Sequence, residues 1–228
     1  MLPPPNLYTP HMVQAIRAME RHHSPARATP ILYQHLISFF HRIPFDPQNL
    51  AAMAAISLAY FACLQPLEYL ATRGTSRPPL RSDVVFSQDF MALDFTVIRS
   101  KTNPKGFTVH LGCSSAPVCP VCLIRALFTL LPAPPSSYLF TTSTAAPMSY
   151  TYLTRKLHSF LSSIGLHPAP FTLHSLRAGA ATTAAAVGCS EHQVQRLGRW
   201  SSQCYRRYIR PSKSQQAALA PLLATSIH

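Results

Sequence analysis

Residues 48–64 constrain the fold most strongly, because their large apolar side chains recur on most faces of a helix. These side chains are Leu50, Met53, Ile56, Leu58, Tyr60 and Phe61. A helix of this kind is stable only where other elements cover it. With 228 residues, 47% of them hydrophobic, the chain can bury one core, or one core and a fragment of a second. We therefore expect this helix at the centre of one main domain.

End signals and patterning predict further helices around it. Thr29-Pro30 and Asp46-Pro47 each put a cap residue before a proline at the first helical position. They predict that helices begin at about residues 31 and 48. Together with the apolar patterning, these signals predict helices at residues 11–21, 31–41, 48–64, 120–130 and 150–164.

A two-residue alternation of side chains predicts a small sheet. Met91, Leu93, Phe95 and Val97 alternate with other residues, and residues 107–111 repeat the pattern. The expected strands are residues 83–87, 91–99 and 107–111, with a turn between the last two. The sequence thus predicts a mixed α+β fold, mainly α-helical, with a small antiparallel three-stranded sheet.

The charge balance indicates a polyanionic partner. The chain has 20 Lys and Arg against 7 Asp and Glu, a net charge of +13, and such an excess is typical of proteins that bind nucleic acid. The excess is densest after residue 150, where nine Lys and Arg accompany one acidic residue, Glu191. A generally basic protein without such a partner is the plainer alternative.

The sequence carries no sign of secretion or of a membrane span. The opening MLPPPNLYTP lacks the charged segment and apolar run of a signal peptide, and no apolar run of about eighteen residues is present. Six cysteines without a secretion signal are expected to be free thiols rather than a disulfide framework. We expect an intracellular, reducing compartment.

Two helices are expected near the C-terminal end. Thr172 is a candidate cap for a helix over residues 173–187, which ends at Gly188 because glycine accepts a left-handed exit. Ser190 and Gln193 form a capping-box pattern for a second helix that ends near residue 198. This pair of helices contains most of the side chains that suggest a function.

His174 and Arg177 lie one turn apart on the first of these helices, so both could contact a single phosphate. Trp200, Tyr205 and Tyr208 follow the second helix, among four arginines. A structural histidine and a packing tyrosine are the plainer interpretations of each residue taken alone. The combination in one region favours phosphate chemistry.

These elements resemble the C-terminal signature of the tyrosine recombinases, or phage-integrase superfamily, which is His-x-x-Arg, then Gly-x-His or Gly-x-Trp, then a nucleophilic Tyr. The matching segments are His174 to Arg177, Gly198-Arg199-Trp200 and Tyr208-Ile209-Arg210. The amino-acid sequence of this region is most similar to recombinases of eukaryotic retrotransposons of the DIRS kind. Several elements in order over about 40 residues are far more specific than any one alone.

The resemblance implies a tyrosine recombinase catalytic domain at residues 29–211. Residues 1–28 would be an N-terminal arm or the remnant of a core-binding domain, and residues 212–228 a C-terminal helical tail that packs on a neighbouring protomer or on its own domain. The implied partner is double-stranded DNA, bound by a homotetramer, and the implied location is the nucleus.

The implied activity is DNA strand cleavage and rejoining for a mobile element, by site-specific recombination or integration. Tyr208 would form a 3′-phosphotyrosine intermediate, which needs no cofactor, and Tyr205 is the rival nucleophile. Arg177 and His174 would stabilise the transition state, and the indole N–H of Trp200 would donate to the phosphate.

Residues 61–70, FACLQPLEYL, match the family segment that ends in Leu-Arg-x-x-Glu, with Gln65 at the position of the first catalytic arginine and Glu68 in register. Glutamine supplies neither charge nor a bidentate fork. Losing such a contact costs about 3 kcal/mol, roughly two orders of magnitude in rate. Either activity is reduced or lost, or another cation substitutes, with Arg73 and Arg77 nearby.

The family carries a catalytic lysine in the turn between the second and third strands. Lys101 matches that position, and Lys105 is the second choice. Lys101 would protonate the leaving 5′ oxygen. A solvated turn lysine is the plainer interpretation of either residue.

Four potential metal ligands, His110, Cys113, Cys119 and Cys122, lie within thirteen residues, and the last two have metal-ligand spacing. However, His110 belongs to an expected strand, and a second Cys-x-x-Cys pair is missing. Relatives of the DIRS kind show Cys-Pro-Val at the start of the next helix. We therefore expect structural cysteines and no metal.

Further basic residues are expected to contact DNA phosphates. They are Lys105, Arg155, Lys156, Arg199, Arg206, Arg207 and Arg210. Two alternatives to an active enzyme stay open. One is a catalytically inactive DNA-binding relic, which Gln65 supports, and the other is a zinc-dependent interaction module, which requires stoichiometric zinc.

Overall fold

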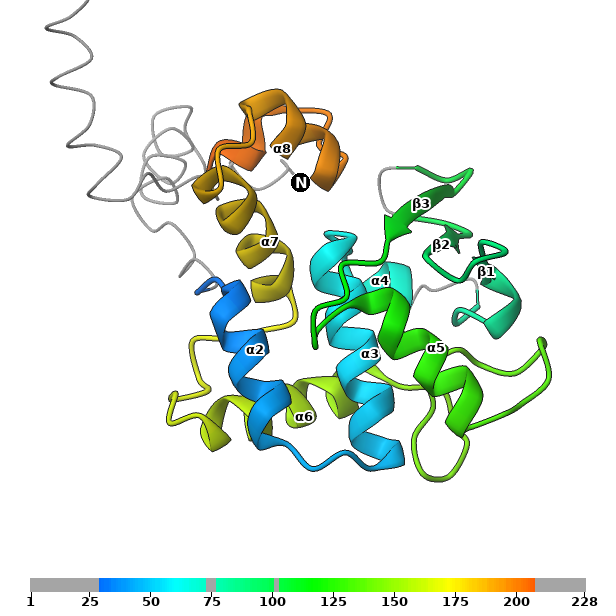
Figure 1. Cartoon of the computed structure of the whole chain (residues 1–228). Helices are drawn as coiled ribbons and strands as arrows, with labels where there is room; N and C mark the ends of the chain where they lie inside the picture. Colours follow the sequence, from blue (N-terminus) through cyan, green and yellow to red (C-terminus); the bar gives the residue numbers. More distant parts are fainter. Residues whose placement is uncertain (1–28, 73–76, 101–102, 208–228) are drawn as a thin grey trace, which may run out of the picture.

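The computed structural model describes residues 29–72, 77–100 and 103–207 (Figure 1). The predicted helix at residues 11–21 and the tail at residues 212–228 lie outside them. The helices are α2 (Tyr33–Arg42), α3 (Pro47–Phe61), α4 (Pro66–Tyr69), α5 (Pro120–Leu130), α6 (Tyr150–Ser163), α7 (His174–Ala186) and α8 (Glu191–Gly198), with short 3-10 turns η1 (Arg81–Asp83) and η2 (Gln203–Arg207). The strands are β1 (Val84–Phe86), β2 (Ala92–Val97) and β3 (Phe107–Gly112). The predicted mixed, mainly helical fold is confirmed.

Helix α3 is the centre of the core, as its sequence predicts. Every residue from Asn49 to Tyr60 is buried, and α5, α6 and α7 all pack against the helix. In Figure 1, α3 lies between the α2–α7 pair and α5. Asp46 caps it through a 2.8 Å hydrogen bond from the Asn49 amide, and Pro47 is its first residue. The cap prediction is therefore confirmed.

The three strands form one antiparallel sheet in the order β1-β2-β3. Phe95 pairs with Val84 on one side and with Val109 on the other. Leu93, Phe95 and Val97 are buried in the core, which matches the predicted alternation. The sheet positions the turn between β2 and β3 beside α4 and α8.

Two predicted helix starts are wrong by one or two residues. Helix α2 begins at Tyr33 rather than Ile31, because the Ile31 amide donates to the Ser175 carbonyl of α7 at 2.9 Å. Thr172 does not cap α7; its own amide donates to the Ser175 hydroxyl at 3.0 Å. A Cβ on Gly179 would collide with the Ile31 carbonyl, so glycine allows this close contact with α7.

Helix α8 begins as predicted. The Ser190 hydroxyl accepts the Gln193 amide and the Gln193 side chain accepts the Ser190 amide, a reciprocal capping box. Gly188 leaves α7 with φ +91°, the left-handed exit. Within the described ranges, no helix is both long and apolar enough to cross a bilayer.

Candidate active site

Arg177 lies at the centre of the candidate site, inside the protein. Its side chain projects from α7, only 6% of the residue is exposed, and it donates to the backbone carbonyls of Cys63 and Gly198. Its guanidinium carbon lies 4.4 Å from the centre of the Trp200 ring. Arg177 thus joins the segment after α3 to the end of α8. These two bonds use two of its five N–H donors.

Gly198 and Trp200 explain why the Gly-x-Trp motif needs a glycine. A Cβ on Gly198 would run into the Trp200 ring, so only glycine allows the ring to fold back toward Arg177. Between them, Arg199 has φ +55° and ends α8 in a left-handed conformation. That conformation costs a residue with a side chain about 1–2 kcal/mol, so the turn must be held by other contacts.

Those contacts come from the Arg199 side chain, which reaches the residues directly after α3. It donates to the carbonyls of Ala62 at 3.0 Å and Cys63 at 3.1 Å, and it lies 3.4 Å from a carboxylate oxygen of Glu68. Its guanidinium stacks 4.4 Å from the centre of the Phe107 ring of β3. Arg199 therefore shares the Cys63 carbonyl with Arg177, and two cations lie side by side.

Arg199 borders a small pocket of about 330 Å³. Its lining residues come from three separate segments: Gln65, Glu68, Ser100, Asn103, Phe107, Gly198, Arg199 and Ser201. The Gln65 amide donates to the Glu68 carboxylate at 2.8 Å, and the Glu68 side chain is 2% exposed. Burial is the main cause that lowers the pKa of Arg199, and Arg177 adds to it while Glu68 opposes it. The guanidinium nevertheless stays charged at neutral pH.

The sequence alone did not reveal Arg199 as a neighbour of Gln65. We expected it to contact DNA, whereas Arg77 was a candidate substitute for the missing arginine. The structure pairs Arg77 with Asp83 through two 2.7 Å bonds, so that guanidinium is engaged elsewhere. Arg73 lies outside the described residues. The sequence feature that could have pointed to Arg199 is Glu68, because a buried carboxylate requires a cation partner.

His174 is the first residue of α7 and is exposed. Protein atoms around its ring still desolvate it, and this, together with the Arg177 charge, lowers its pKa. The imidazole is therefore neutral at pH 7, and a neutral imidazole can donate one hydrogen bond to a phosphate oxygen.

The turn between β2 and β3 lies at the same pocket. Ser100 is buried and accepts the Asn103 amide on its hydroxyl at 3.0 Å, and both residues line the pocket. Lys101 itself lies outside the described residues. Lys105 is exposed two residues beyond Asn103. The described part of the turn is thus adjacent to Arg199.

Of the two candidate nucleophiles, only Tyr205 is described. It is 4% exposed, and its phenol donates to Glu191 at 3.1 Å. Its ring packs 6.2 Å from that of Trp200. These contacts make Tyr205 a packing residue. Tyr208 lies outside the described residues.

Those of the expected DNA-contacting residues that the structure describes do not form one group. Lys156 donates to the Asn49 side chain at 2.9 Å, and its neighbour Arg155 is exposed on α6. Figure 1 shows α6 at the end of the molecule opposite to α8. Arg206 is exposed near α8 and pairs with Glu191 at 3.0 Å. Arg210 and the side chain of Arg207 are not described.

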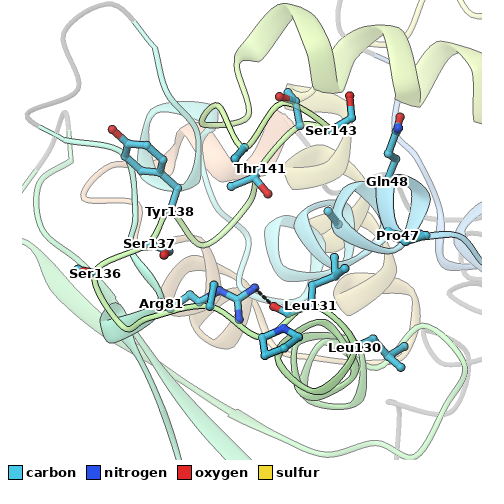
Figure 2. A pocket seen from close by; sticks show the side chains of 15 residues that line it. Pro47, Gln48, Arg81, Leu130, Leu131, Ser136, Ser137, Tyr138, Thr141 and Ser143 are labelled. Carbon is cyan, nitrogen blue, oxygen red and sulfur yellow. Dashed lines mark hydrogen bonds between the residues drawn. The ribbon is translucent and has the colours of Figure 1, made fainter.

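A larger pocket of about 740 Å³ lies away from this site (Figure 2). Hydroxyl-bearing residues such as Ser137 and Thr141 line it, and Arg81 donates there to the Leu131 carbonyl. It contains none of the predicted catalytic residues. Size alone therefore does not identify the functional site, and the smaller pocket beside Arg199 is the better candidate.

Comparison with known proteins supports the fold. No protein-family model matches the chain, and no curated protein matches its sequence. Among solved structures, the XerH site-specific recombinase bound to palindromic difH substrate is similar, with a TM-score of 0.64 and 15% identity over 86% of this chain and 52% of that one. XerA recombinase matches with a TM-score of 0.61 and 16% identity, over 85% of this chain and 64% of that one.

A lambda integrase dimer bound to a COC′ core site also matches, with a TM-score of 0.61 and 18% identity over 89% of this chain and 65% of that one. The chain thus spans about half to two thirds of the length of these proteins. At such low identity the likeness concerns the fold. The structure has the fold of a tyrosine recombinase catalytic domain.

Proposed function

We propose that this chain is the catalytic domain of a recombinase that cleaves and rejoins double-stranded DNA through a 3′-phosphotyrosine on Tyr208. The observation that carries the proposal is the pair of arginines, Arg177 and Arg199, that share the Cys63 carbonyl beside Gln65. Two fixed guanidinium groups are what a phosphoryl-transfer transition state needs, because its charge grows as the new bond forms.

In the reaction, the Tyr208 oxygen attacks the phosphorus and loses its proton, while the bond to the 5′ oxygen breaks. Lys101 gives the leaving oxygen a proton. Arg177, Arg199 and neutral His174 stabilise the equatorial oxygens, and Trp200 supports Arg177 through its ring. The phosphotyrosine conserves the bond energy, so the reverse steps rejoin a new strand.

The cation missing at Gln65 is supplied by Arg199 in this proposal. Its contact with buried Glu68 ties it to the same motif that has Gln65 at the arginine position. We also propose that the domain spans residues 29–211, that its element is a retrotransposon of the DIRS kind, and that it acts in the nucleus as a tetramer on DNA.

An inactive DNA-binding relic is the second candidate. It is favoured by the burial of Arg177 and by the bonds of both arginines to backbone carbonyls. Such bonds stabilise the fold whether or not DNA is cleaved.

A covalent-trapping assay separates the two. The protein is mixed with labelled, nicked duplex from the ends of its own element and run on a denaturing gel. A shifted band that is lost in Tyr208→Phe and kept in Tyr205→Phe supports the enzyme. No band from the natural protein or from Gln65→Arg, with DNA binding intact, would establish the relic.

A further inference from the structure

Three thiols meet where the sheet joins α5. Cys113 follows β3, Cys119 is the cap residue of α5, and Cys122 lies in the first turn of that helix. Their sulfur atoms all lie within 4.8 Å of one another. The Cys113 sulfur is 3.4 Å from that of Cys122 and 3.7 Å from that of Cys119.

These distances fit a shared metal better than a disulfide. A disulfide bond is about 2.05 Å long, far shorter than either separation. Four sulfurs around a tetrahedral zinc, at about 2.3 Å each, lie about 3.8 Å apart. The three sulfurs therefore have nearly the spacing of three corners of one coordination tetrahedron.

The loop that brings them together is well fixed. The Cys113 amide donates to the Met91 carbonyl at 2.7 Å, and Ser57 of α3 donates to the Val118 carbonyl at 2.5 Å. Ser115 has φ +54°, which turns the chain back. The Ser114 amide donates to the Cys119 sulfur at 3.3 Å, the kind of outer contact that orients a metal-binding thiolate.

His110 is not a fourth ligand in this arrangement. It is exposed on β3 and its ring bonds Asp94 at 2.6 Å. Within the described ranges, no other histidine, cysteine or carboxylate joins the group. Cys113 and Cys122 are only partly buried, so solvent can reach a fourth position. The sequence showed a single Cys-x-x-Cys pair, and the return of Cys113 became visible only in the fold.

We propose that Cys113, Cys119 and Cys122 bind one zinc ion as thiolates, with water at the fourth position, and that the ion fixes the end of β3 to α5. Binding releases the thiol protons to solvent. Phe107, at the other end of β3, stacks on Arg199, so the ion also steadies the strand that borders the candidate active site. The proposal does not depend on DNA cleavage.

The test is metal analysis of the whole chain, purified without chelator and desalted, beside Cys113→Ser, Cys119→Ser and Cys122→Ser. Cys189→Ser, a partly buried cysteine after α7, is the matched control. We expect stoichiometric zinc in the natural protein and the control, and at least a tenfold loss in Cys119→Ser and Cys122→Ser.

Cobalt gives a second readout that does not require the variants to fold. The natural protein, stripped of metal and loaded with Co²⁺, should show a thiolate-to-cobalt charge-transfer band. Zinc content that is unchanged in the three variants would overturn the proposal. So would a Cys113–Cys122 disulfide in protein purified without reductant, or copper bound in place of zinc. Trapping activity is not part of either readout, so the proposed function can fail independently.

Discussion

Arg199 has a structural role and, in the proposed reaction, a chemical role in the same side chain. It holds a strained left-handed turn through bonds to Ala62 and Cys63, and it brings to the pocket the positive charge that Gln65 does not supply. Arg177 combines roles in a similar way, because it binds the carbonyls of two segments and lies against Trp200. Fixed charges of this kind need no reorganisation when the transition state forms.

If Arg199 replaces the missing cation, an arginine at position 65 should compensate for the loss of the arginine at position 199. Arg199→Met should lower the trapping rate by about two orders of magnitude, and adding Gln65→Arg should restore at least part of it. Arg196→Met, an exposed change on α8, is the control. Urea unfolding of each variant separates loss of charge from loss of fold. A double variant that is equally stable but no faster than Arg199→Met would contradict the idea.

Among the elements, α3 has an N-terminal cap that the sequence specifies through Asp46 and Pro47. Asp46 accepts hydrogen bonds from both the backbone amide and the side chain of Asn49. Pro47 is the first helical residue, where the backbone N–H that proline lacks would have no partner within the helix. The helix is buried along nearly its whole length, so fraying at its start would expose core residues such as Leu50.

Asp46→Ala should therefore lower the free energy of unfolding by about 1 kcal/mol, the usual cost of a lost N-cap. Denaturant unfolding at neutral pH measures it. Asp89→Ala changes a carboxylate that is exposed in the turn before β2 and should have a much smaller effect. Equal effects of the two changes would show that the cap does not stabilise α3.

The sequence predicted elements whose signals are local. The capping box at Ser190, the proline at position 47 and the alternation around Phe95 each needed only neighbouring residues, and each is confirmed. The start of α2 was missed because a bond from Ile31 to α7 overrides its cap signal. The Arg199 pocket was missed because its members are distant in sequence. The sequence did identify Cys113, Cys119 and Cys122 as potential ligands, but it could not show that their sulfur atoms lie within 4.8 Å of one another.

Considered as one body, the protein is strongly basic. If it binds DNA as proposed, its affinity should depend steeply on salt. The logarithm of the binding constant should fall by about 0.9 for each neutralised phosphate per unit of log salt. Arg206→Met, near α8, should reduce that slope by about 1. Lys156→Met should leave it unchanged, since Lys156 bonds Asn49 and α6 lies at the opposite end of the molecule (Figure 1). Titrations of labelled duplex at several salt concentrations measure both slopes, and equal slopes would contradict this placement.

The bonds of Arg177 to Cys63 and Gly198 bridge separations of 114 and 21 residues along the chain. Contacts between such distant residues close late, because the entropy of a long loop is lost before they form. The two contacts of Arg177 can therefore form only when the segments around residues 63, 177 and 198 have come together. A nascent or partly unfolded chain already carries the basic charge, but it lacks the fixed pair of arginines that the proposed reaction needs. If the chain cleaves DNA as proposed, completion of the fold would then be the step that switches cleavage on.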